Sequence, residues 1–259
     1  MKSDLIHPTA IVEEGAQLGK EVQVGAYAFI GSEVALGDRC VVMHHASING
    51  KTKCGSENEF HPFCSIGGKT QDLKYQGEPT HLNIGSKNVF REFVTINRAT
   101  APKTATQIGD QNLFLAYAHV AHDCVIGNNV IFSNNGTVAG HVIVDDHVVM
   151  GGLSAAHQFC RIGAFSMIGG CSKVVKDVPP YALVDGNPAV LCGINQVGLE
   201  RHGISDEIIK QIRFAYRILM DSSLNTTQAI ERISEISPLV PEVKNLLQFI
   251  QESKRGVIR

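Results

Sequence analysis

The chain has no tryptophan, and only 6% of its 259 residues are aromatic, so its core must be filled mainly by aliphatic side chains. The formal net charge of −2 gives no general attraction to nucleic acid or to an anionic membrane. No apolar run reaches membrane-spanning length, and the first residues, MKSDLIHPTAIVEEG, lack the apolar segment of a secretory signal. We expect a cytoplasmic protein without an integral membrane segment or a nucleic-acid partner.

Seven cysteines are present, but none belongs to a CxxC pair. Such pairs are typical of zinc and redox sites, so neither is expected here. Cys40, Cys64, Cys124 and Cys160 share one small-residue position of the repeat described next. We interpret them as small buried side chains in a reducing compartment.

From Ile6 onward, apolar residues recur at every sixth position. A helix repeats every 3.6 residues and a strand every second residue, so neither explains this pattern. Hexapeptide repeats are typical of a parallel β-helix, in which each unit is a short strand and a corner. Three units then close one coil of 18 residues. The longest unbroken series is Ile108, Phe114, Val120, Ile126, Phe132, Val138, Val144, Met150, Ala156, Ile162, Ile168 and Val174.

Glycine often follows the apolar position, and we expect it to supply corner backbone angles that other residues resist. The repeat keeps its phase across two interruptions, which are therefore loops extruded from the coils at about 68–81 and 98–106. Loops on a rigid scaffold are frequent binding elements. The first loop carries Asp72, Lys74 and Tyr75, which makes passive surface decoration the weaker interpretation.

The repeat ends near DVPPY, where prolines interrupt strand pairing. Beyond it the pattern becomes helical. Ser205 is expected to cap one helix, and further helices are predicted over 227–236 and 241–254. The sequence thus predicts a mainly β fold, with a parallel β-helix over residues 1–190 and a small α-helical domain over 191–259.

In a coil of 18 residues, positions 18 apart share one column. His122 is then aligned with Gly140 and Gln158. Asp123 is aligned with His141. A histidine can deprotonate a hydroxyl, a carboxylate can orient its imidazole, and a bare backbone N–H can stabilise an attacked carbonyl. The combination indicates acyl transfer to a sugar hydroxyl; the alternatives are ordinary solvated histidines, or zinc held between subunits as in γ-type carbonic anhydrases.

Several segments resemble the UDP-N-acetylglucosamine acyltransferases of lipid A synthesis, over nearly the whole chain. They are HPTAIVEEGAQLG, QDLKYQGEPT, AHVAHDC, AGHVIVDD, HQFCRIG, GGCS, DVPPY and GNPA. The resemblance implies a left-handed parallel β-helix that forms a homotrimer with active sites between subunits. It also implies transfer of an (R)-3-hydroxyacyl group from acyl carrier protein to the 3-hydroxyl of UDP-N-acetylglucosamine. No metal or cofactor is implied besides the phosphopantetheine of the acyl carrier protein.

By the same resemblance, His122 looks like the general base, Asp123 its partner and Gly140 the oxyanion donor. Gly170 looks like the end of the acyl groove, a ruler that admits a long acyl chain. The groups expected to hold the sugar nucleotide or the acyl-pantetheine are Asp72, Lys74, His119, His141, His157 and Gln158, with Asn195 and Arg201 on the nucleotide.

Two other hypotheses stay open on the sequence. One is a related hexapeptide transferase, either a glucosamine N-acyltransferase or an acetyl-CoA-dependent sugar acetyltransferase. The former usually carries an additional N-terminal domain, whereas here the repeat begins at Ile6. The other is a non-enzymatic solenoid that serves as a scaffold or ligand-binding surface.

Overall fold

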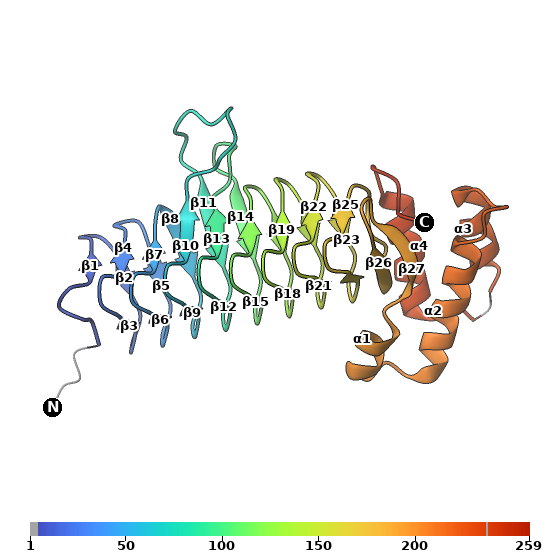
Figure 1. Ribbon diagram of the computed structural model, residues 1–259, viewed down its shortest axis with the longest axis horizontal. Helices are drawn as coiled ribbons and strands as arrows, with labels where there is room; N and C mark the ends of the chain where they lie inside the picture. The colour runs from blue at the N-terminus through green and yellow to red at the C-terminus, as the bar shows by residue number, and fades with distance from the viewer. Residues whose placement is uncertain (1–4, 237) are drawn as a thin grey trace.

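The structure, a computed structural model, describes residues 5–236 and 238–259. Short strands wind into a long prism with three faces, and helices cover one end (Figure 1). The first face consists of β1 Ile11–Val12, β4 Phe29–Ile30, β7 Ser47–Ile48, β10 Ser65–Gly68, β13 Thr95–Asn97, β16 His119–Val120, β19 Thr137–Val138, β22 Ala155–Ala156 and β25 Lys173–Val174.

The other two faces have the same construction. The second consists of β2 Gln17–Leu18, β5 Ala35–Leu36, β8 Lys51–Cys54, β11 His81–Ile84, β14 Ala105–Ile108, β17 Val125–Ile126, β20 Ile143–Val144 and β23 Arg161–Ile162. The third consists of β3 Gln23–Val24, β6 Val41–Val42, β9 Glu59–Phe60, β12 Val89–Phe90, β15 Leu113–Phe114, β18 Ile131–Phe132, β21 Val149–Met150, β24 Met167–Ile168, β26 Ala182–Asp185 and β27 Val190–Ile194.

Strand pairing follows the predicted register. Val120 pairs with Val138, and Val138 pairs with Ala156, so each apolar position lies against its equivalent one coil away. Across the two loops the partners are further apart in sequence, yet Ile66 still pairs with Ile96, and Ile96 with Val120. The loops therefore leave the alignment of the coils intact.

The apolar positions fill the interior of the prism. The side chains of Phe60, Phe90, Phe114 and Phe132 are fully buried and stack with ring centroids 5.0 to 5.3 Å apart. Each such burial contributes about 1.5–3 kcal/mol. Ile6 is an exception at 42% exposed, because it lies at the N-terminal end of the prism, where the stack of coils is open.

The repeat cysteines are buried, as predicted. They are Cys40, Cys64, Cys124 and Cys160, and all are free thiols. Burial raises the pKa of the Cys124 thiol to about 12, so it stays protonated at neutral pH.

Glycine after the apolar position has a role different from the expected one. The corner residues with left-handed φ are mostly not glycines; Asp123 and His141, for example, have φ of 58° and 61°. A β-carbon on Gly37 would lie 2.6 Å from the carbonyl carbon of Gly55 on the next coil. Glycine is needed there because successive corners approach closely, so the expectation of special backbone angles was wrong; Gly67, with φ of 74°, is an exception.

Both loops leave the corner between the first and second faces. The first loop, residues 69–80, joins β10 to β11, and the second loop, residues 98–104, joins β13 to β14. In Figure 1 they project from the same edge of the prism, on neighbouring coils.

The helical end begins after the antiparallel pair of β26 and β27. Its helices are α1 Gln196–Arg201, α2 Asp206–Leu219, α3 Thr226–Ser234 and α4 Pro241–Glu252. The sequence did not predict α1, and Ser205 precedes α2 without a side-chain capping bond. The buried Tyr216 hydroxyl of α2 donates to the Pro180 carbonyl at the end of the prism. Among the helices described, none is both long and apolar enough to cross a membrane.

Candidate active site

The corner between the first and second faces carries most of the predicted site residues. His122 and Asp123 follow β16, and one coil later Gly140 and His141 follow β19. The backbone N–H of His141 donates to the carbonyl of His122 over 3.0 Å, and the N–H of Phe159 donates to the carbonyl of Gly140 over 3.1 Å. The coils thus stack His122, Gly140 and Gln158 in one column, as the period predicted.

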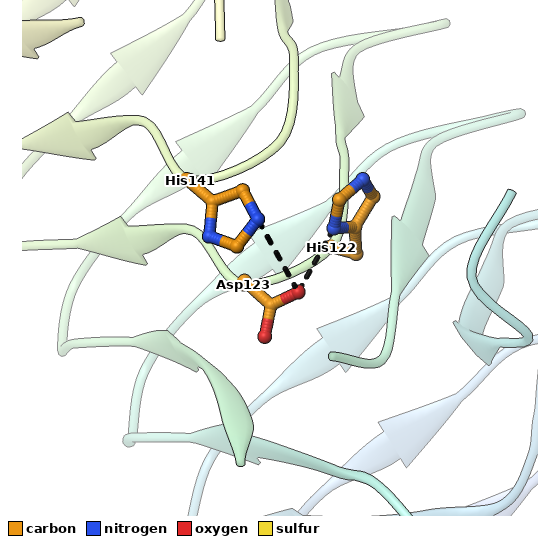
Figure 2. Close-up of side chains that lie close together, drawn as sticks. All are labelled: His122, Asp123 and His141. Atoms are coloured by element: carbon orange, nitrogen blue, oxygen red, sulfur yellow. Dashed lines mark hydrogen bonds and ion pairs between the residues drawn. The ribbon is translucent and has the colours of Figure 1, made fainter. Parts of the chain in front are cut away.

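His122 and Asp123 form a close pair (Figure 2). The Nδ1 atom of His122 lies 2.9 Å from Oδ2 of Asp123, and the two side chains are only 15% and 9% exposed. With Nδ1 donating to the carboxylate, the Nε2 atom is left as the nitrogen that can accept a proton. A carboxylate that orients an imidazole in this way is characteristic of a general base.

Opposing effects act on the pKa of Asp123. Burial raises it, whereas hydrogen bonds from His122, the backbone N–H of Thr100 and the hydroxyl of Thr104 lower it. The net result is a pKa below the usual value, so Asp123 is ionised at neutral pH. The ionised form is the one that orients the imidazole and stabilises its protonated state.

His141 completes the group seen in Figure 2. Its Nε2 atom lies 3.9 Å from Oδ2 of Asp123, and its ring meets the ring of His122 edge-on, with centroids 5.3 Å apart. The other side of the His141 ring stacks on Phe159 at 4.7 Å. This stacking holds a half-exposed polar ring beside the dyad of His122 and Asp123.

Gly140 leaves the space above the imidazole free of side-chain atoms. Within the described residues, its backbone N–H has no acceptor, although its carbonyl accepts the N–H of Phe159. A bare N–H beside a base can donate to an oxygen supplied by a substrate.

His119 lies in β16, with Nδ1 2.7 Å from the hydroxyl oxygen of Thr95. Burial lowers its pKa, and the nearby His122 lowers it further, so His119 is neutral at pH 7. His157 and Gln158 lie at the same corner on a further coil and are exposed. A cavity of about 510 Å³ adjoins this region, lined by His141, Phe159, Arg161, Asp177, Lys254 and Arg255, among others.

Asp72 and Lys74 lie in the first loop, at the corner that carries His122. The backbone N–H of Lys74 donates to Oδ1 of Asp72 over 2.9 Å, which fixes the turn at that point. Whether these two side chains hold substrate stays a prediction.

Three predicted residues lie elsewhere in the chain. Asn195 caps α1, and its amide donates to the carbonyl of Phe165 at the corner between the second and third faces. Arg201 lies in α1. Gly170 follows β24, at the corner between the third and first faces. Within one chain, the structure does not bring these residues to His122.

Sequence reasoning missed Thr100 and Thr104, which contact the carboxylate of Asp123. The available signal was indirect: the second loop interrupts the repeat on the coil directly before His122. It also missed Phe159, which shares the column of Asp123 and His141.

The ligand atoms of His122, Asp123 and His141 lie within 4.8 Å of one another, close enough to consider a metal site. However, Oδ2 of Asp123 already accepts from His122 and from the N–H of Thr100, and Oδ1 accepts from Thr104. A metal would have to displace these bonds. The contacts therefore favour a base with its orienting carboxylate over a metal centre.

Two family models match the chain. Residues 177–258 match domain 2 of Udp N-acetylglucosamine O-acyltransferase, and residues 105–140 match the bacterial transferase hexapeptide of six repeats.

Solved structures are similar over almost the full length. LpxA from Acinetobacter baumannii is 45% identical with a TM-score of 0.95, over 99% of this chain and 100% of that one. LpxA from Bacteroides fragilis, a UDP-N-acetylglucosamine acyltransferase, is 40% identical with a TM-score of 0.95, over 98% and 100%. The Arabidopsis UDP-N-acetylglucosamine acyltransferase is 38% identical with a TM-score of 0.87, over 98% and 100%. The predicted fold, a left-handed parallel β-helix followed by helices, is confirmed. The chain belongs to the UDP-N-acetylglucosamine acyltransferase family.

Proposed function

We propose that this protein transfers an (R)-3-hydroxyacyl group from the thioester of acyl carrier protein to the 3-hydroxyl of UDP-N-acetylglucosamine, the first step of lipid A biosynthesis. Membership of the acyltransferase family supports the reaction class. The observation that carries the mechanism is the pair of His122 and Asp123 beside the N–H of Gly140, which has no acceptor in the part of the chain that the structure describes.

The chemistry follows from these three residues. Nε2 of His122 accepts the proton of the sugar hydroxyl while the hydroxyl oxygen attacks the thioester carbonyl. Negative charge develops on the carbonyl oxygen, and the N–H of Gly140 donates to it. The C–S bond then breaks, and the sulfur leaves as the thiol after taking the proton back from His122. Asp123 stabilises the imidazolium between the two proton transfers.

The neighbouring groups suit the recognition of polar substrates. His119 is neutral and His141 is half-exposed, so both can exchange hydrogen bonds with a sugar. Gln158 and His157 extend the same corner, and Asp72 and Lys74 lie in the first loop, which leaves the prism at the same edge. We assign these six residues to the sugar nucleotide and the acyl-pantetheine.

We propose further that the protein acts as a homotrimer with active sites between subunits. Asn195 and Gly170 lie at corners other than that of His122, and Arg201 lies in α1, so a second copy would have to bring them to the base. Mixing His122→Ala chains with Arg201→Ala chains tests this, because only a shared site yields some intact sites. Mixed assemblies as inactive as the separate variants would contradict it.

The experiment that tests the function compares wild-type protein with His122→Ala in an assay with UDP-N-acetylglucosamine and 3-hydroxyacyl donors. We expect the variant to lose about 10²–10⁴-fold in kcat, the usual contribution of a general base. His7→Ala, at the far end of the prism, is the matched control. Undiminished turnover by His122→Ala would overturn the mechanism. A CoA donor that replaced acyl carrier protein, or an amide product by mass spectrometry, would instead point to a related transferase.

A further inference from the structure

The carboxylate of Asp123 is held from outside its own coil. Its Oδ2 atom accepts the backbone N–H of Thr100 over 2.9 Å, and its Oδ1 atom accepts the hydroxyl of Thr104 over 3.0 Å. Both partners belong to the second loop, which has no repeat pattern. The backbone N–H of Asp123 donates to the buried hydroxyl oxygen of Thr106, where β14 resumes.

The hydroxyl of Thr104 has one hydrogen and two acceptors within reach, Oδ1 of Asp123 and the carbonyl of Ala101. The Ala101 carbonyl already accepts the backbone N–H of Thr104 over 3.1 Å. An ionised carboxylate is the stronger acceptor of the two. The carboxylate therefore attracts the hydroxyl hydrogen more strongly, although the Ala101 carbonyl is the nearer acceptor, at 2.6 Å against 3.0 Å.

The second loop is itself fixed by the first. The hydroxyls of Thr70 and Thr100 lie 2.8 Å apart, and the backbone N–H of Lys103 donates to the carbonyl of Pro79 over 3.1 Å. These contacts place the N–H of Thr100 against the carboxylate. A carboxylate held on both oxygens cannot rotate away from the imidazole without breaking a charge-assisted bond.

We propose that the second loop positions Asp123 for catalysis, with Thr104 as a positioning residue that acts through Asp123 on His122. This inference rests on the proposed function of His122 as the base. Thr104 does not touch the imidazole; its hydroxyl sets the direction of the carboxylate, and the carboxylate sets the direction and tautomer of the ring. Partners that orient the ligands of metal sites alter affinity or activity by about 10–100-fold, and we expect an effect at the lower end of that range here.

The test compares Thr104→Val, which removes the hydroxyl, with Thr104→Ser, which keeps it. Thr9→Val is the matched control, because Thr9 is also an exposed threonine with two hydrogen-bond partners, but on the first coil. We expect Thr104→Val to lower kcat about tenfold with KM for UDP-N-acetylglucosamine nearly unchanged. Thr104→Ser should retain most of kcat, and Thr9→Val should behave like the wild type.

A double-mutant cycle separates positioning from a general structural effect. In an Asp123→Asn background, Thr104→Val should cost little more, because its route to His122 is already broken. A second tenfold loss there, a loss in Thr104→Ser equal to that in Thr104→Val, or wild-type kcat in Thr104→Val would each overturn the inference. Thermal unfolding of each variant checks that the fold persists. His122→Ala distinguishes failure of the proposed function from failure of this inference. If His122→Ala is inactive while Thr104→Val is unimpaired, only the positioning role of Thr104 fails.

Discussion

Gly140 lies so close to the imidazole of His122 that any side chain at position 140 would displace the ring. A β-carbon at position 140 would lie 2.5 Å from Cε1 and 2.6 Å from Nε2 of His122. The absence of a side chain therefore does two things at one position. It lets the imidazole lie against the next coil, and it leaves a backbone N–H that has no acceptor within the described residues.

Gly140→Ala is expected to lower kcat by about 10²-fold, because displacement of a catalytic group by roughly 1 Å commonly has that effect. The clash is with a side chain rather than with backbone, so the variant should still fold. Gly31→Ala is a suitable control, since a β-carbon there would have its nearest neighbour at an ordinary 3.6 Å. Equal activity in the two variants would contradict a tight fit between Gly140 and His122.

Asp123→Asn should lower kcat by about 10²–10⁴-fold with little change in KM. Oδ2 of Asp123 accepts from both Thr100 and His122, so the amide oxygen of the variant should take that place, with its NH₂ facing the hydroxyl oxygen of Thr104. Nδ1 of His122 then keeps its acceptor, but the variant has no negative charge to stabilise the imidazolium that forms during the reaction. Nitrogen NMR of labelled histidine should therefore show the wild-type tautomer in the variant; wild-type kcat would contradict a role for the charge.

Gly170→Met is expected to shift donor preference toward shorter acyl chains. Gly170 has no left-handed φ, and a β-carbon there would meet only the carbonyl oxygen of Gly152, at 3.4 Å. Backbone geometry therefore does not require glycine at position 170. What glycine supplies there is open space where a side chain would otherwise lie. The ratio of kcat/KM for short over long donors should rise by about tenfold or more. Gly170→Ala should give a smaller shift in the same direction, and an unchanged ratio in both would argue against the ruler.

Chelation should leave activity intact. The acceptor positions of Asp123 are used by His122, Thr100 and Thr104, so the dyad is complete with hydrogen bonds alone. Turnover before and after exhaustive treatment with a chelator, together with metal analysis of the protein, shows whether activity depends on a metal. Activity that disappears with the metal and returns with added zinc would favour the metal interpretation of His122, Asp123 and His141.

Stability should fall as the pH drops through the mildly acidic range, in part because of His119. Burial holds its folded-state pKa below the ordinary 6.5. Between the two values the unfolded chain binds a proton that the folded chain does not, so the stability present above pH 6.5 is lost as pH decreases. His119→Gln should therefore show a smaller drop in melting temperature between neutral and mildly acidic pH. His7→Gln is the control, and an undiminished drop in His119→Gln would refute the assignment.

The repeat made the fold and the corner of His122 predictable because both depend only on counting along the chain. The same count aligned His122 with Gly140 and Asp123 with His141 before any coordinates were known. It could not reveal Thr104, since the second loop has no period and its contacts depend on how it folds back. The role of glycine at the corners was misjudged for a related reason: the close approach of Gly37 to Gly55 is a property of two coils, not of one residue.

The sequence also did not predict the contacts of residues that lie away from the corner of His122. Local sequence indicated most of the helical end, but α1 is only six residues long and lacks a clear apolar stripe. Its cap, Asn195, was expected on the nucleotide, whereas its side chain bonds Gly198 and Phe165 within the chain. The roles of Asn195, Arg201 and Gly170 toward substrate therefore stay predictions that depend on assembly.

Both loops emerge from one edge of the prism while the pairing on either side of them continues undisturbed. The register of the coils is therefore independent of both loops, although the second loop must keep Thr100 and Thr104 against the carboxylate of Asp123. Changes in the length or sequence of the first loop can then alter substrate preference during evolution while the pairing of the rigid coils is preserved.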